Sequence, residues 1–529
     1  MMNRKGKLLL FILMFGMEFA LGFYISYVLG YMHSDAISRV ANAFYVLYSR
    51  DPHLGAIGFV WNPLPSLMEL GLLVFYPLVP ALATYGLAAV LMSSIFAALT
   101  SVLLYSSGKK MGIGAGISLT IALLYSLNPF VFLFGANGLS DAPYIYFIMY
   151  TVIEFCFWLK SRSASSLILS AFALAMAFWT RYEAVPLGVA LAVGVVIAVF
   201  WMHRNYYSTG PTLREKAYKV EATWILLLIP AVFSGLLWIF FNYIIMDNPF
   251  YFLNSEYSNV AQSGQLQSDQ SFVELFNSPW LALKFIAGKT LWYSAPLFAV
   301  LLIRLFTKRL FQGGTLIILL MFVSVPALQF VLLMRESSFG WFRYFMYVFP
   351  ITVAWLPYEL SLVRDRGRKL AFAVVVLSML VTAGLLSYAM TDPSIAPDEN
   401  NFINMADNEH LKEQELDRSV GAWIDSNMND GTNIMTDSYS AYNLLVSSDN
   451  LKRYLITSDY KFDTALNDPP GNDVDYILIP KPLPGIPKSA INKLYPNMFE
   501  HGNEWATLYH DFDGKWRLYK IKKWVAPQG

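Results

Sequence analysis

The sequence predicts a polytopic α-helical membrane protein with a small soluble α/β domain at its C-terminal end. Of the 529 residues, 56% are hydrophobic and only 14% are charged, whereas a soluble domain carries about 25% charged residues. The apolar residues form runs long enough to cross about 30 Å of hydrocarbon. After Met390 the composition changes, because acids outnumber bases 21 to 13 there, against 16 to 25 before it. A single soluble enzyme is therefore excluded.

Apolar runs along the first three quarters of the chain predict about eleven transmembrane helices. They lie near residues 8–30, 84–106, 113–128, 142–159, 164–180, 185–202, 222–244, 290–306, 314–334, 344–361 and 370–390. The first run is too long for the apolar part of a signal peptide, so we interpret it as a retained span. The run 64–80 is interrupted by prolines and Glu69. We expect it to lie at the outer interface or to re-enter; counting it as a crossing gives the alternative of twelve spans.

The basic residues predict the orientation of the chain. Clusters of Lys and Arg fall in alternate loops, and such clusters stay on the cytoplasmic side of a membrane. The sequence therefore predicts a multi-pass protein of the cell membrane, with a cytoplasmic N-terminus and an extracytoplasmic C-terminal domain. In this arrangement residues 1–390 form the membrane domain, and its outer loops span residues 31–83, 128–141 and 247–289.

The first outer loop begins with an amphipathic pattern. Apolar side chains from Ile37 to Tyr48 share one helical face, and Ser34 is a suitable N-cap. This pattern is typical of a helix lying on a membrane surface.

Residues 391–529 predict the soluble α/β domain. Residues 405–427 have helical periodicity, and five short strands are expected at 433–436, 454–457, 476–479, 507–510 and 516–521. No Gly-rich nucleotide-binding loop accompanies them, and the acidic composition argues against nucleic acid as a partner. Cys156 is the only cysteine of the chain, which excludes a disulfide framework.

Three acids stand at the outer ends of predicted helices. They are Asp35 after the first span, Asp141 at the start of the fourth and Glu183 after the fifth. Ionisable groups at such positions are retained when they form ion pairs, face water or take part in binding or catalysis. The alternative for Asp35 and Asp141 is an N-cap. For Glu183 it is an ion pair with Arg181 or with another cation at the interface.

Two arginines on the outer side run against the positive-inside trend. Arg335 and Arg343 bracket a loop that continues into an aromatic cluster containing Tyr344. Their guanidinium groups could lie among lipid headgroups beside an aromatic belt. Alternatively, they bind a lipid phosphate through charge-assisted, bidentate hydrogen bonds.

An acid and a phosphate-binding arginine on one face of the membrane fit glycosyl transfer from a polyprenyl-phosphate sugar. The acid would deprotonate an acceptor hydroxyl. The arginine would stabilise the charge that develops on the departing phosphate.

At these residues the sequence resembles the GT-C superfamily of membrane glycosyltransferases, including protein O-mannosyltransferase-like and aminoarabinose-transferase-like enzymes. The likeness covers roughly residues 1–390 and lies in the order and common sidedness of the motifs. The matching pieces are Asp35, Trp61-Asn62-Pro63-Leu64-Pro65, Ser140-Asp141, Thr180-Arg181-Tyr182-Glu183, Asn248-Pro249-Phe250, and Arg343-Tyr344 with Pro350.

The resemblance implies a polyprenyl-phosphate sugar donor, inversion at the anomeric carbon, and an active site between the first outer loop and the membrane. Asp35 matches the catalytic base and Asp141 a second catalytic acid of the second outer loop. Arg343 matches the donor-phosphate ligand. The other expected contacts are with the donor phosphate (Arg335, Tyr344) and with substrate (Arg181, Glu183, Trp61, Asn62).

The sequence departs from the family pattern in two places. Ser34-Asp35-Ala36 supplies one acid where two adjacent acids are expected, and the outer loops contain no Asp-x-Asp. The metal site is therefore unknown. His33 and His53 could supply nitrogen ligands, but isolated histidines are more often interfacial hydrogen-bonding groups. No cofactor is certain, and a divalent metal ion stays open.

Two other function classes remain. A transporter or lipid flippase would also have many apolar spans, but transporters often contain repeated halves with broken helices at the midplane. Here no clear repeat is present and the candidate groups gather at one surface. A noncatalytic receptor or assembly factor is the other alternative. For the enzyme, the expected partners are the lipid-linked sugar, membrane lipid, and a glycan, lipid or protein acceptor.

Overall fold

The computed structural model describes residues 4–202, 212–255, 258, 270–405, 408–483 and 488–522. The chain divides into two compact units. The first unit comprises Met1–Gly22, Met92–Ala136 and Ser140–Met405, and it is helical. The second comprises Phe23–Leu91, Asn137–Leu139 and Ala406–Gly529, so the first outer loop packs with the C-terminal segment.

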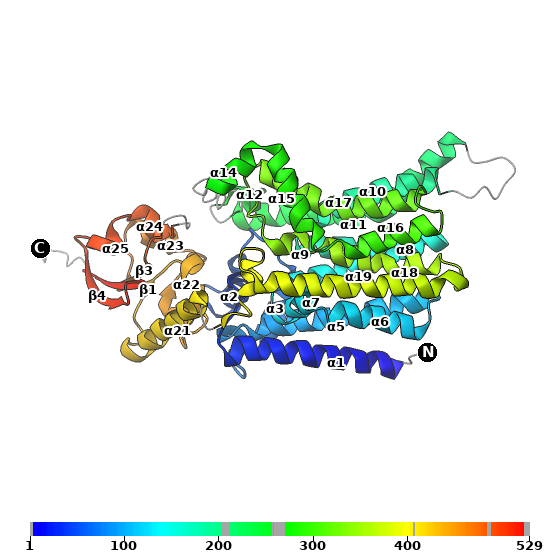
Figure 1. Cartoon of the computed structure of the whole chain (residues 1–529). Coiled ribbons are helices and arrows are strands. Elements are labelled where there is room, and N and C mark those ends of the chain that lie inside the picture. The colour runs from blue at the N-terminus through cyan, green and yellow to red at the C-terminus, as the bar shows by residue number, and fades with distance from the viewer. Residues whose placement is uncertain are drawn as a thin grey trace, which may run out of the picture. The chain divides into compact units, whose positions relative to one another are not determined.

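The first unit is a bundle of long apolar helices, which run alongside one another in Figure 1. Six helices of the described ranges are long and apolar enough to cross a membrane. They are α1 (Arg4–Phe23, continued by the π-helical turn Tyr24–Val28), α5 (Leu87–Lys110), α8 (Asp141–Ser161), α11 (Leu213–Met246), α17 (Gly313–Met334) and α19 (Asp365–Thr391). Shorter helices complete the bundle: α9 (Ala164–Thr180), α10 (Ala184–Phe200), α12 (Tyr251–Asn254), α14 (Gln270–Asn277), α18 (Val348–Ser361) and α20 (Pro397–Asn400).

Two further apolar stretches are bent pairs of helices. The pair α6 (Ala115–Ser126) and α7 (Pro129–Ala136) meets at 68°, and α15 (Pro279–Leu291) and α16 (Ala295–Phe306) meet at 82°. In both pairs the second helix has a proline within its first two residues. Proline has no N–H to continue a preceding helix, so a break is favoured there.

The predicted fold class is confirmed, because a helix of the bundle lies at each of the eleven predicted spans. The number of crossings stays a prediction. The run 64–80 contains α3 (Leu64–Leu73), whose ten residues extend only about 15 Å at 1.5 Å per residue. That length is about half of the hydrocarbon thickness, so α3 alone is too short to cross.

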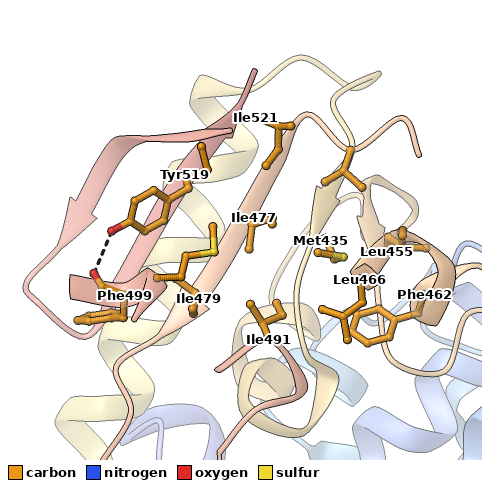
Figure 2. Packing of buried hydrophobic residues seen from close by; sticks show 14 residues of the cluster. Met435, Leu455, Phe462, Leu466, Ile477, Ile479, Ile491, Phe499, Tyr519 and Ile521 are labelled. Carbon is orange, nitrogen blue, oxygen red and sulfur yellow. Dashed lines mark hydrogen bonds between the residues drawn. The ribbon is translucent and has the colours of Figure 1, made fainter. Parts of the chain in front are cut away.

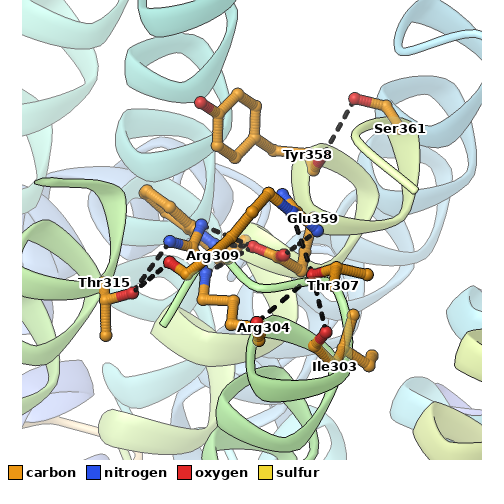
Figure 3. A network of polar contacts seen from close by, with 9 residues as sticks. Ile303, Arg304, Thr307, Arg309, Thr315, Tyr358, Glu359 and Ser361 are labelled. Atoms are coloured by element: carbon orange, nitrogen blue, oxygen red, sulfur yellow. Dashed lines mark hydrogen bonds and ion pairs between the residues drawn. The ribbon is translucent and has the colours of Figure 1, made fainter. Parts of the chain in front are cut away.

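A buried ionic network joins three helices of the first unit (Figure 3). Arg304 on α16 donates two hydrogen bonds to Glu359 on α18, at 2.8 and 2.6 Å. Arg309 binds the other carboxylate oxygen at 2.8 Å, and Arg304 also donates to Thr315 on α17. Glu359 is fully buried and Arg304 is 2% exposed. Buried charges are tolerated only when they are paired in this way.

Glu359→Gln should destabilise the bundle, because the buried guanidinium of Arg304 and the partly buried one of Arg309 would lose their shared counter-ion. Breaking a buried pair by removing one partner costs about 3–5 kcal/mol. Thermal unfolding of the purified protein in detergent should therefore begin at a clearly lower temperature. Asp365→Asn is the matched control, because that carboxylate is 90% exposed and pairs only with Arg368 at the surface. Equal melting temperatures for both variants would contradict a stabilising network.

The second unit contains the α/β domain that the sequence predicts. All five expected strands are present: β1 (Ile434–Met435), β2 (Tyr454–Leu455), β3 (Tyr476–Pro480), β4 (Ala506–Phe512) and β5 (Trp516–Ile521). They form one sheet in the order β2-β1-β3-β5-β4. β1 is parallel to both β2 and β3, and β5 is antiparallel to its neighbours. The helices are α21 (Glu409–Asn427), α22 (Ser438–Leu445), α23 (Phe462–Asn467), α24 (Ala490–Leu494) and α25 (Met498–His501), with a 3-10 turn at Leu451–Arg453.

Alternating strand residues build the core of this domain (Figure 2). Ile477 and Ile479 of β3 point to the same face and are fully buried with Ile491 of α24. Tyr519 of β5 joins them and donates a hydrogen bond to the backbone oxygen of Phe499. The alternation of side chains along a strand therefore places Ile477 and Ile479 on one buried face.

The first outer loop contains α2 (Ser34–Tyr48), the 3-10 turn Leu54–Ile57, α3 and α4 (Ala81–Thr84). The predicted helix 37–48 is present, but two expectations about it were wrong. Its N-cap is His33, whose ring nitrogen accepts the backbone N–H of Asp35, and not Ser34. Its apolar face is not left for a membrane surface, because Ile37, Val40 and Phe44 are buried as α2 packs against α3 and α22.

The first loop and the C-terminal domain share polar contacts within the second unit. Arg50 donates to the side chain of Asn433 at 2.7 Å and to the backbone oxygens of Lys452 and Arg453. The Gln414 side chain of α21 accepts the backbone N–H of Met32 and donates to its backbone oxygen. A change of composition at residue 390 could not indicate this association. The proposed boundary between domains 1–390 and 391–529 stays a prediction.

Arg50→Ala should loosen the contact between the first loop and the C-terminal domain. Three hydrogen bonds from a charged group would be lost, at a cost of about 1.5–3 kcal/mol. Hydrogen exchange should become faster in β1 and in the turn Leu451–Arg453, while β4 keeps its protection. Lys452→Ala serves as the control, because the side chain is exposed and only its backbone oxygen meets Arg50. Unchanged exchange in the Arg50 variant would rule out this anchor.

Candidate active site

Arg343 lies on a short 3-10 helix, η4 (Phe342–Phe345), between α17 and α18. The turn before it depends on Gly340, which has φ of +57°. A Cβ at this glycine would lie 2.6 Å from the ring of Phe285. A glycine therefore allows the tight approach that directs η4 inward.

The Arg343 guanidinium is 2% exposed. It lies 4.6 Å from the centre of the Trp341 ring and 5.7 Å from that of Tyr344, and its Nε is 3.6 Å from Asp398 Oδ2. Aromatic faces stabilise a cation by about 0.5–2 kcal/mol, which is less than the cost of burying a charge. The site therefore depends on its acidic neighbours.

Those neighbours come from the segment that follows the last long helix. Asp398 and Glu399 lie on α20, and Glu399 is 1% exposed. Lys289 of α15 donates to the backbone oxygen of Ile395 at 3.0 Å, and Asn400 donates to that of Met390 at 3.0 Å. These two bonds fix the segment beside Arg343.

A second polar cluster surrounds Asp141, which is fully buried at the start of α8. Its Oδ1 accepts a hydrogen bond from Tyr347 at 2.6 Å and one from Arg181 at 3.3 Å. Arg181 also donates to Glu183, at 2.7 and 3.2 Å. Asp141 is not the N-cap of α8, because Ser140 occupies that position and the Asp141 side chain binds side chains of other elements. Glu183 forms the ion pair with Arg181 that was one of its expected alternatives.

The Arg343 cluster and the Asp141 cluster interact electrostatically through Glu399. The charges of both Arg343 and Asp141 act on the carboxyl of Glu399. Arg335, unlike Arg343, is not buried: its side chain is exposed at the end of α17. Tyr344 is half-buried against Trp341.

The remaining candidates lie in the second unit. The Asp35 side chain is 47% exposed, and its Oδ2 is 4.0 Å from Nδ1 of His33. Its charge acts on Tyr439 and Tyr442 of α22, so the C-terminal domain contributes to its surroundings. Nearby, Arg39 donates to the backbone oxygen of Asn62 at 3.2 Å, and its guanidinium lies 5.9 Å from the Trp61 ring.

Sequence reasoning missed four residues of these clusters. Tyr347 lies in the aromatic cluster that follows Arg343 and was not expected to bind Asp141, and Lys289, Asp398 and Glu399 were not singled out. A signal was present, since Lys289 is one of few outer cations and two adjacent acids follow the last span.

The structure describes no group of three His, Cys, Asp or Glu side chains able to hold a metal ion within the ranges given above. The Nδ1 atom of His53 instead lies 2.6 Å from the backbone oxygen of Asp51, and its ring makes a tilted contact with the ring of Tyr460. The metal dependence stays an open prediction.

Comparison with known proteins adds two findings. Residues 72–238 match the model of the family described as dolichyl-phosphate-mannose-protein mannosyltransferase. The structure is similar to the crystal structure of ArnT from Cupriavidus metallidurans bound to undecaprenyl phosphate, with a TM-score of 0.52 and 11% sequence identity over 98% of both chains. The chain has the GT-C fold of membrane glycosyltransferases. No curated protein matches this sequence significantly.

The GT-C resemblance drawn from the sequence is thus confirmed by two independent comparisons. The family match includes Asp141 and Arg181, and the structural match extends over both units. This fold and the long apolar helices of the described ranges support a multi-pass membrane protein. The roles of individual residues remain proposals.

Proposed function

We propose that this protein is an inverting glycosyltransferase that moves a sugar from a polyprenyl-phosphate donor to an acceptor hydroxyl at the outer face of the cell membrane. The observation that carries the proposal is the buried guanidinium of Arg343, placed between aromatic rings and a partly exposed carboxylate. A phosphate anion matches the fixed donor geometry of a guanidinium. It would take the place of Asp398 against Arg343.

The reaction proceeds by direct displacement at the anomeric carbon. Asp35 accepts the proton of the acceptor hydroxyl, whose oxygen forms a bond to C1 of the sugar. The bond between C1 and the phosphate oxygen breaks, and its electron pair stays on that oxygen. Attack from the face opposite the leaving group inverts the anomeric centre. The exposed side chain of Asp35 suits this role, because a base must reach a substrate that enters from solvent.

Arg343 stabilises the lipid phosphate as it departs. Negative charge grows on the phosphate in the transition state, and a fixed cation in a water-poor site lowers the energy of that charge most effectively. Tyr344 lines the same arginine, and the exposed Arg335 guides the lipid phosphate toward it from the membrane surface.

Asp141 and its partners support the substrate in the same proposal. The ion pairs of Arg181 with Asp141 and Glu183 hold the guanidinium in place, and the second oxygen of Asp141 has no hydrogen-bond partner in the described part of the chain. That oxygen can accept a sugar hydroxyl. Trp61 and Asn62 are proposed to contact the sugar or the acceptor, which is a glycan, lipid or protein.

Asp35→Asn should lower sugar transfer by roughly 100-fold or more, the usual contribution of a general base. Transfer is measured in membranes supplied with radiolabelled lipid-linked sugars. Binding of the donor should stay unchanged, because Asp35 acts on the acceptor. Asp463→Asn, which changes an exposed acid of the same unit, should transfer sugar normally. Full transfer by a folded Asp35 variant would remove this residue from catalysis.

Arg343→Ala should weaken binding of polyprenyl phosphate by about 10- to 100-fold, since a hydrogen bond to a charged group is worth about 1.5–3 kcal/mol. Arg343→Lys should recover only part of this loss, because a lysine presents a point charge without the planar fork. Binding is measured with the protein in nanodiscs. Lys284→Ala provides the control, as an exposed cation of α15. Donor affinity that survives in Arg343→Ala would refute the phosphate site.

A further inference from the structure

Glu399 is the most deeply buried acid of the segment between the last long helix and the C-terminal domain. Its side chain is 1% exposed, and no other described residue forms a hydrogen bond with either carboxyl oxygen. An unsatisfied buried polar group costs about 1–3 kcal/mol. A carboxyl retained at that cost indicates a partner that the protein itself does not supply.

The surroundings of Glu399 identify the chemistry of that partner. Charged and titratable groups face it from each neighbouring element: Asp398 on α20, Arg343 on η4, Asp141 on α8, Lys289 on α15 and Tyr293 after α15. Two of these groups are cations that lie beside the same short segment. These two cations can bind an anion, provided that the acids beside them do not repel it.

Protonation removes this conflict for Glu399. Burial and, to a lesser degree, the negative charge of Asp398 raise its pKa to about 8, although the backbone N–H of Glu399 and the Arg343 cation oppose the increase. Below that pH the carboxyl is neutral and carries an O–H donor. A carboxylic acid kept neutral by an apolar site can donate a hydrogen bond to an anion, which a carboxylate cannot do.

We propose that Glu399 is a second ligand of the phosphate bound at Arg343, with its neutral carboxyl donating a hydrogen bond to a phosphate oxygen. The inference rests on the proposed function, because it takes the lipid phosphate to be the ligand of Arg343. The protonation state of Glu399 thereby determines the affinity of the site for phosphate. Its deprotonation removes the donor and adds a negative charge beside the phosphate, so affinity declines as pH rises above about 8.

The test measures binding of polyprenyl monophosphate to the full-length protein in nanodiscs between pH 7 and pH 9.5. The second pKa of a phosphate monoester is about 6, so the ligand keeps nearly the same charge over this range. For the native protein we expect affinity to fall about 10-fold or more across the range, because each pH unit above a pKa depletes the acid form about 10-fold. Melting temperatures at each pH verify that the protein stays folded.

Two variants separate a ligand from a merely structural acid. Glu399→Gln keeps a neutral donor at every pH, so its affinity at pH 7 should match the native protein and stay constant to pH 9.5. Glu399→Ala has no donor and should bind several-fold more weakly at pH 7, also without pH dependence. Glu409→Gln changes an exposed acid and should retain the native pH profile.

The outcomes distinguish this inference from the proposed function. A native pH profile in Glu399→Gln, or native affinity of Glu399→Ala at pH 7, would overturn the role of Glu399 while the loss of binding in Arg343→Ala still supports the phosphate site. No binding by the folded native protein at any pH would overturn both. Inorganic phosphate at equal concentration should not displace the lipid; displacement would show that the site recognises a free anion instead.

Discussion

Burial of the Arg343 guanidinium is the constraint on which the arrangement around η4 and α20 depends. A cation with 2% exposure must be compensated by nearby charge and by polarisable rings. The chain supplies Asp398 from the segment after α19 and two aromatic faces from the loop of Arg343 itself. The conformation of that loop, with Gly340 at positive φ, follows from the need to bring these groups together.

The same rule governs the other charges of the bundle. Asp141 is compensated by Arg181 and Tyr347, and Glu359 is shared between Arg304 and Arg309. These two networks differ in one respect. Both oxygens of Glu359 meet cations, which suits a structural role, whereas one oxygen of Asp141 and both oxygens of Glu399 lack partners on other residues within the described segments. We propose substrate contacts for these carboxyl oxygens of Asp141 and Glu399.

The sequence predicted the fold better than the site. Apolar runs and alternating strands are local patterns, so the helices of the bundle and the five strands from Ile434 to Ile521 could be located directly. Arg343 was singled out because an arginine in a loop predicted to be outer breaks the charge trend. Its partners Asp398 and Glu399 lie more than 50 residues away and follow no periodic pattern. The packing of α2 on α22 was also hidden, because an amphipathic helix has the same pattern whether protein or membrane covers it.

The donor-phosphate site at Arg343 is tested most directly by a structure of the protein with a bound polyprenyl-phosphate sugar, determined by electron cryo-microscopy. We expect the phosphate oxygens to lie at hydrogen-bond distance, about 3 Å, from both Arg343 and Glu399. We also expect Asp398 to have moved away from the guanidinium and the anomeric carbon to face Asp35. A phosphate bound elsewhere, with the contact between Arg343 and Asp398 intact, would contradict the phosphate site at Arg343.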